Sequence, residues 1–181
     1  MPPDPPSRPA PIDAFATARL TAERLRAEHL DDLVALHLDA AVSRYLGGTR
    51  TAAQTAAYLD ANLAHWDRRG FGLWIIRDRA GRFLGRAGVR PLQVQGVEEI
   101  EIAYTFHQAA WGQGYASEIA EALRDLAFGP LDLPQLVGIV MTENEASRRV
   151  LEKTGFTFER AYVDAGHELV LLRLRNPGPT A

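Results

Sequence analysis

The pattern of this chain changes at Phe106, and that change limits its possible folds more than any other feature. Before Phe106, three β-like runs, FGLWIIRD, RFLGRAGVRPL and EEIEIAYTF, are separated by turns at Ala80-Gly81 and Gln95-Gly96. After it, the pattern predicts a helix over 114–128, a strand over 135–141, a helix over 144–154, and strands over 156–163 and 167–174. Consecutive strands favour an antiparallel meander, whereas strands joined through a helix can run parallel. We therefore expect a mixed α/β or α+β fold.

The N-terminal part adds one strand and two helices to this plan. Residues 18–25 alternate imperfectly between apolar and polar and predict a first strand. Residues 27–42 have apolar side chains at helical spacing, with acidic residues near the start, where the helix dipole favours them. Residues 51–70 run from a threonine cap to a glycine stop and predict a second helix. The sequence RYLGG separates the two helices.

The chain has room for one domain. Its 181 residues can bury a sizeable core but are too few for two domains of ordinary size. Six of the first eleven residues are proline, which cannot join a sheet ladder or a helix interior. We expect a Pro-rich flexible arm over 1–16, a single domain over 17–175 and a flexible tail over 176–181.

Composition excludes several classes of function. The net charge is −3 without a basic patch, so we expect no nucleic-acid partner, and a cationic substrate is slightly favoured over an anionic one. No apolar run is long enough for a membrane span, so we expect a soluble protein. The chain has no cysteine, which excludes thiolate chemistry and is typical of the cytoplasm. Five scattered histidines show no spacing for a metal site, and His167 alone remains a candidate for the acceptor site.

Two glycines precede the central helix in the sequence WGQGYASE. Gly112 and Gly114 let backbone N–H groups approach a bound group closely, and the helix that follows points its positive end at the same place. An anion would be stabilised there. The sequence contains neither the phosphate-loop lysine nor the third glycine of a dinucleotide fingerprint, so this stretch alone favours a plain turn between strand and helix over a phosphate site.

A second polar motif lies in TENEASRRVLEKTGF, residues 142–156. Asn144 and Ser147 are three residues apart and share one helix face. They could carry function, or they could complete a helix cap in which Thr142 and Glu145 form a capping box.

The third candidate is a carboxylate on the strand VEEIEIAYTF. Alternation places Glu99 and Glu101 on one face of this strand, and Ile100, Ile102 and Tyr104 on the other. A carboxylate in the middle of a strand can act as a base, but it can equally belong to a solvated face.

Together these stretches resemble the GCN5-related N-acetyltransferase (GNAT) superfamily, in its branch similar to the ribosomal-protein alanine N-acetyltransferases (RimJ/RimL-like). The resemblance extends from about Thr17 to Arg173 and includes RYLGG, FGLWII and EIAYTF. Its most specific part is Asn-x-x-Ser-x-x-x-Leu-x-Lys-x-Gly-Phe from Asn144 to Phe156. It implies a central mixed, mostly antiparallel sheet of about seven strands flanked by about four helices.

The resemblance also implies that the chain binds acetyl-CoA, without a metal. In the family, a loop Arg/Gln-x-x-Gly-x-Gly/Ala holds the pyrophosphate of coenzyme A with backbone N–H groups, and here Trp111 stands where arginine or glutamine is usual. The strand before the loop would lie along the pantetheine arm. The implied binding residues are Tyr104, Thr105, Phe106, Trp111, Gly112, Gln113, Gly114, Tyr115, Ala116, Ser117, Asn144 and Ser147.

The implied reaction is direct acetyl transfer to an amine in a ternary complex. An amine with a pKa of about 8 to 10.4 is largely protonated at pH 7, so a base assists, and Glu101 matches the family position for it. The departing thiolate benefits from a hydroxyl donor. Many members have a tyrosine at the position of Leu151, and in this branch Ser147 is the substitute, with Asn144 orienting the pantetheine or a water.

The acceptor remains open at this stage. A protein N-terminus, an aminoglycoside, a polyamine and an amino acid are all compatible with the sequence, and the helix pair with its break at 44–48 is expected to select among them. The resemblance is also compatible with a homodimer. Two alternative functions are a non-catalytic acyl-CoA-binding or sensing module, and an acyltransferase that uses a longer acyl-CoA.

Overall fold

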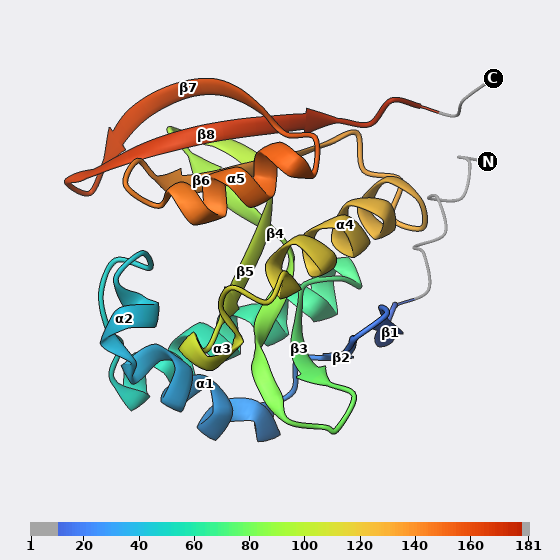
Figure 1. Ribbon diagram of the computed structural model, residues 1–181, viewed down its shortest axis with the longest axis vertical. Coiled ribbons are helices and arrows are strands. Elements are labelled where there is room, and N and C mark those ends of the chain that lie inside the picture. The colour runs from blue at the N-terminus through green and yellow to red at the C-terminus, as the bar shows by residue number, and fades with distance from the viewer. Residues whose placement is uncertain (1–10, 179–181) are drawn as a thin grey trace, which may run out of the picture.

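One eight-stranded sheet runs through the structure, a computed structural model that describes residues 11–178 (Figure 1). The strands are β1 (Ala14–Ala16), β2 (Leu20–Arg24), β3 (Leu73–Asp78), β4 (Phe83–Val94), β5 (Val97–Phe106), β6 (Gln135–Met141), β7 (Thr157–Asp164) and β8 (His167–Arg175). Their order is β1-β2-β3-β4-β5-β6-β8-β7, and only β5 and β6 are parallel neighbours. The predicted mixed, mostly antiparallel sheet is confirmed, with eight strands rather than about seven.

The sheet divides where β5 meets β6. The chain reaches β6 through a helix, which is why these two strands run parallel. Their pairing is confined to one position, Glu101 opposite Val137, whereas β4 and β5 pair along ten positions. Among the described residues, no strand pairs with the edge of β5 beyond Glu101. The sheet therefore separates into two halves, β1 to β5 and β6 to β8 (Figure 1).

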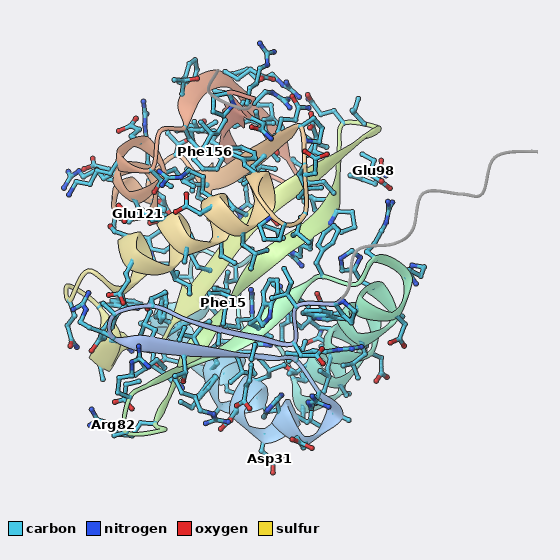
Figure 2. All side chains as sticks on the ribbon, turned by 90° about the vertical axis from the view of Figure 1, so that its right-hand side faces the viewer. Phe15, Asp31, Arg82, Glu98, Glu121 and Phe156 are labelled. Carbon is cyan, nitrogen blue, oxygen red and sulfur yellow. The ribbon has the colours of Figure 1, made fainter. Side chains whose placement is uncertain are left out.

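Helices cover both faces of the sheet. They are α1 (Leu30–Leu38), α2 (Ala40–Ser43), α3 (Ala52–Arg69), α4 (Tyr115–Phe128) and α5 (Glu145–Lys153), with short 3-10 helices at Ala27–His29 and Gln108–Ala110. Figure 2 shows α3 and α4 on opposite sides of β4 and β5. The apolar face of α4, with Ile119, Leu123 and Leu126, packs into the main core. The helices α1 and α3 cover the face of the sheet opposite α4 (Figure 2).

Local sequence explains the ends of these elements. In α3, Thr51 and Gln54 form a capping box, and Gly70 ends the helix in the left-handed conformation. The turn between β4 and β5 is Gln95-Gly96, both with positive φ (50° and 84°), as a two-residue hairpin turn requires. The elements from α4 to β8 lie within two residues of their predicted bounds.

Parts of the predicted N-terminal arm and C-terminal tail belong to the folded structure. Residues 14–16, assigned to the arm, form β1, because their backbone pairs with β2 and the Trp74 indole fixes Ile12 through a 2.9 Å hydrogen bond. Asn176, assigned to the tail, is held by hydrogen bonds to Leu133 and Pro134. The predicted helix over 27–42 is also divided, because Asp39 has extended backbone and caps α2. Residues 1–10 and 179–181, the rest of the predicted arm and tail, lie outside the described residues.

Candidate active site

The loop between β5 and α4 presents unused backbone donors. Gly112 and Gly114 have φ of 71° and 78°, a conformation that only glycine adopts without strain. Gly114 is the N-cap of α4 and no side chain caps this helix, whereas Thr51 caps α3 and Asn144 caps α5. The N–H groups of the first turn, at Tyr115, Ala116 and Ser117, are therefore available to an anion.

Two side chains of the loop stabilise its shape instead of filling the space before α4. The Trp111 indole donates to Phe106 O at 2.8 Å, and the Gln113 amide donates to Ala109 O at 2.6 Å. A Cβ built on Gly112 meets nothing within 4 Å, so the space in front of the loop is open. The loop can thus hold a phosphate through its backbone alone, although Trp111 replaces the usual arginine or glutamine.

Arg19 supplies a cation beside the same loop, and the sequence did not indicate it. Its Nη1 donates to Gln113 O at 2.8 Å, its Nε lies 2.7 Å from Glu118 Oε2, and its guanidinium lies 4.6 Å from the Tyr115 ring centre. Burial opposes the charge of Glu118, but bonds from Thr17 and Arg19 lower its pKa overall. Arg19 and Glu118 are 99 positions apart, so no local pattern predicts this contact.

In the described structure, the last residues of β5 have one edge without a strand partner, although Phe106 O accepts the hydrogen bond of the Trp111 indole. Tyr104, Thr105 and Phe106 pair with β4 on one side, and pairing with β6 on the other side is confined to Glu101. An extended chain can add to such an edge as a further strand. The 3-10 helix Gln108–Ala110 connects this edge to the glycine loop, so only residues 107–110 separate the two predicted binding segments.

Glu101 lies where β5 and β6 separate. Its side chain is nearly buried, and Arg90 Nε and Nη2 both lie 3.2 Å from its Oε2. Burial opposes the charge of Arg90, but the attraction of Glu101 and Tyr58 together with the hydrogen bond to Glu101 raises the Arg90 pKa above its ordinary value. Among the described residues, no hydrogen bond reaches Glu101 Oε1, which leaves this oxygen available as a proton acceptor.

Arg90 is a site residue that the sequence interpretation missed, although a signal was present. A two-residue turn at Gln95-Gly96 fixes the register of the hairpin and places Arg90 opposite Glu101. The two glutamates predicted on one face of β5 have different partners. Glu99 is bound by Arg173 through two bonds of 2.7 and 2.9 Å, so its carboxylate is committed to a structural ion pair.

Asn144 and Ser147 meet at the start of α5. The Asn144 side chain accepts from Ser147 N at 3.2 Å, so the cap is Asn144, and the proposed Thr142–Glu145 capping box is wrong. The Ser147 hydroxyl is half-buried and donates no hydrogen bond within residues 11–178. Leu151, at the position where many family members have a tyrosine, is buried in the core. It packs so closely against Gly138 that a Cβ on this glycine would lie 2.5 Å from Leu151 Cδ1.

Tyr104 connects the two sides of the divided sheet. Its hydroxyl donates to Ser147 O at 3.1 Å, joining β5 to the first turn of α5. Burial raises the pKa of the hydroxyl, and the bond to Ser147 opposes this only in part, so the group stays protonated. The Tyr104 side chain thereby holds Ser147 near the free edge of β5.

Other kinds of site are not formed by the described residues. In residues 11–178 no three His, Cys, Asp or Glu side chains are grouped for a metal ion, and no helix is long and apolar enough to span a membrane. His167 is exposed at the turn between β7 and β8, and no described contact connects it with Glu101 or Ser147.

Comparison with known proteins defines the class. Residues 19–157 match the acetyltransferase (GNAT) domain family, and the chain belongs to this family. It is an N-acetyltransferase that uses acetyl-CoA. The chain is 32% identical to YkkB of Bacillus subtilis over 152 residues, 80% of this chain and 88% of YkkB.

Solved structures show the same fold. An acetyltransferase from Agrobacterium tumefaciens is 28% identical, with a TM-score of 0.79 over 90% of this chain and 94% of that one. RimL, a ribosomal L7/L12 α-N-protein acetyltransferase in complex with coenzyme A, has a TM-score of 0.75 over 90% of this chain and 97% of its own, at 18% identity. The expected resemblance to the ribosomal-protein acetyltransferases thus extends to the fold.

Proposed function

We propose that this acetyltransferase transfers the acetyl group to a primary amine, on a protein N-terminus or a small molecule, by direct attack in a ternary complex. One observation carries the proposal. In the described structure, the β5 edge loses its strand partner after Glu101, and a short connection through the 3-10 helix Gln108–Ala110 leads from it to the start of α4, which has no side-chain cap. A thioester arm added along this edge would have its anionic end at the helix N-terminus and its reactive end beside a carboxylate.

The residues present fit acetyl-CoA. The backbone N–H groups from Gly112 to Ser117 would hold the pyrophosphate, and the left-handed glycines keep these groups accessible. The Trp111 and Gln113 side chains would hold the loop in this shape. The backbone of Tyr104, Thr105 and Phe106 would pair with the pantetheine, and Asn144 would orient it from α5.

Two side chains would move protons in the reaction. Acetyl-CoA supplies the acetyl group as a thioester. Glu101 would accept the proton that the attacking amine loses, directly or through a water, as a carbon–nitrogen bond forms and the carbon–sulfur bond breaks. Ser147 would donate a proton to the departing thiolate and regain one from solvent. The chain has no cysteine to form a thioester with the acetyl group, which agrees with direct transfer.

Thiol release in the presence of an amine panel tests this function. Purified protein is mixed with acetyl-CoA and with peptides that have free N-termini, amino acids, polyamines and aminoglycosides, and acetyl-CoA binding is measured in parallel. We expect thiol release that depends on at least one amine, with an acetylated product. Binding of acetyl-CoA without acetylation of any amine would show a binding module instead. Faster turnover of a longer acyl-CoA than of acetyl-CoA would show that the longer acyl-CoA is the preferred acyl donor.

A further inference from the structure

Buried polar atoms without partners gather in one region of the described structure. The six buried side-chain nitrogen and oxygen atoms that have no hydrogen-bond partner in residues 11–178 belong to His37, Arg50, Tyr58, His65 and Arg86. These residues come from α1, from the segment before α3, from α3 and from β4. The region therefore lies between the helices α1 and α3 and the central strands, opposite the face that carries α4 (Figure 2).

Three arginines surround Tyr58 in this region, and we name Arg50, Arg86 and Arg90 the arginine cluster. Their guanidinium carbons lie 5.1, 5.1 and 5.9 Å from the centre of the Tyr58 ring. The His37 ring packs edge-on against the same tyrosine at 5.1 Å. Burial lowers the His37 pKa to about 3, so this histidine adds no charge at neutral pH.

The arginine cluster carries more positive than negative charge. Among the described residues that shift the Arg86 pKa, Arg50 and Arg90 are cations and Glu101, which binds Arg90, is a carboxylate. Arg86 is only 2% exposed and its Nε has no partner in the described structure. Burial lowers the Arg86 pKa, yet a guanidinium stays charged in proteins. A buried cation with an unpaired donor is unfavourable until an anion binds it.

The cluster adjoins the proposed reaction centre. Arg90 lies opposite Glu101 in the hairpin, and Arg86 lies opposite Thr105 on the same face. The intervening Ala87 and Val89 are buried in the core, which places both arginines on the other face of β4. The Arg90 side chain is 26% exposed and Arg86 is only 2% exposed, so Arg90 forms the solvent-facing end of the cluster, beside Glu101.

From this juxtaposition we propose that the acceptor is an amine that bears a carboxylate near its amino group, and that Arg86 and Arg50 bind that carboxylate while Glu101 faces the amine. The inference rests on the proposed function and narrows its acceptor. A carboxylate matches the fork of donors on a guanidinium. Polycationic acceptors are disfavoured, because they would meet three arginines next to one glutamate.

Matched acceptor pairs test this inference on the unmodified enzyme. Each acidic acceptor is compared with its amide. The pairs are glutamate and glutamic acid diamide, β-alanine and β-alaninamide, and a peptide with an N-terminal Asp and the same peptide with an N-terminal Asn. Spermidine serves as the polycationic acceptor. We expect kcat/KM at least tenfold higher for the acid of each active pair, since a charge-assisted bond has about that effect. Equal or better turnover of the amides or of spermidine would overturn the inference. If no amine in any of these sets is acetylated, the result would contradict the proposed function itself.

A variant pair separates recognition from a structural role of the cluster. Arg86→Met removes the guanidinium and keeps a long side chain, and Arg68→Met, an exposed arginine of α3, is its matched control. We expect Arg86→Met to raise KM for the acidic acceptor about tenfold and for its amide far less, with partial rescue in Arg86→Lys. An equal loss for acid and amide, with no rescue by lysine, would contradict carboxylate binding. If Arg86→Met does not fold, the acid and amide pairs with the wild-type enzyme still decide the question.

Discussion

Glu101 and Arg90 form an ion pair across the β4–β5 hairpin, with the guanidinium nitrogens Nε and Nη2 of Arg90 both 3.2 Å from Glu101 Oε2. The pair leaves the second oxygen of Glu101 without a hydrogen bond from the described residues. Arg90 can therefore orient the carboxylate without occupying the oxygen that would accept a proton. Arg90 is also a member of the arginine cluster, so it connects the proposed base with the group of arginines that is proposed to bind the acceptor.

Replacement of Arg90 is expected to lower the free energy of unfolding and to leave the proposed base without its partner. Arg90→Gln leaves a nearly buried carboxylate without its partner, which costs about 1 to 3 kcal/mol of unfolding free energy. The control is Arg69→Gln, because Arg69 and Glu98 form a half-exposed pair from which we expect less than about 1 kcal/mol. Urea unfolding measures both. A similar loss in the two variants would show that the Arg90–Glu101 pair is an ordinary surface contact.

Gly114 is expected to be required for binding of acetyl-CoA. Gly114→Ala forces an L side chain into a φ of 78° at the start of α4, and relief of that strain moves the N–H groups of the first turn. We expect the Kd for acetyl-CoA to rise about tenfold, by loss of at least one charge-assisted bond. Calorimetric titration measures this directly.

Gly81→Ala is the matched control for backbone strain. Gly81 has a φ of 82° in the turn between β3 and β4, and a Cβ there meets open space, as at Gly112. The control should lower stability by about 1 kcal/mol and leave acetyl-CoA binding unchanged. If both alanine variants bind acetyl-CoA like the wild type, the glycine loop does not hold its pyrophosphate.

Ser147→Ala tests proton donation to the leaving thiolate. The helix cap uses the backbone N–H of Ser147, so the variant should fold normally, whereas kcat should fall about 10- to 100-fold. An acetyl thioester of a more acidic thiol needs less help from a donor, and we expect it to restore most of the rate. The same relative loss with both donors would indicate that Ser147 has only a positioning role.

Stability is expected to fall on mild acidification. Burial lowers the pKa of His37 to about 3 and that of His65 to about 4, from 6.5 in an unfolded chain. Between pH 6.5 and 4 the unfolded state therefore binds more protons than the folded state. In this range, each histidine that stays neutral in the folded state lowers the free energy of unfolding by up to about 1.4 kcal/mol for every unit by which the pH falls. Denaturant titrations at pH 7 and pH 5 measure the loss.

His65→Leu is the informative variant for this pH dependence. Both ring nitrogens of His65 lack a hydrogen-bond partner in the described structure, and its ring packs against Phe71, so an apolar side chain should be tolerated. We expect a smaller difference between pH 7 and pH 5 than in the wild type. An unchanged difference would mean that His65 does not resist protonation in the folded state.

Local patterns predict the order of elements well and the long-range contacts poorly. Helical and strand periodicity place α4 to β8, and the turn at Gln95-Gly96 is sufficient to set Arg90 opposite Glu101. By contrast, Arg19 reaches Gln113 and Glu118 from the far end of the chain, and Tyr104 reaches Ser147 across the divided sheet. Such contacts depend on how the elements pack, for which a single sequence carries no periodic signal.

The total charge and the local arrangement of charges favour different acceptors. The chain as a whole has a net charge of −3, which favours a cationic substrate, whereas the residues beside Glu101 are three arginines. The acidic residues that determine the sum are largely committed to ion pairs elsewhere, such as Glu99 with Arg173 and Glu118 with Arg19. The local arrangement, and not the sum, decides what can bind beside the proposed base.

The most direct test of the account is single-turnover acetyl transfer by Glu101→Gln, with Glu98→Gln, an exposed position of the same strand, as the control. If Glu101 is the base, the transfer rate falls by about 10² to 10⁴. In that case the Kd for acetyl-CoA stays within about twofold of the wild-type value, and the control remains fully active. A Glu101→Gln enzyme that transfers the acetyl group at the wild-type rate would contradict the proposed role of Glu101.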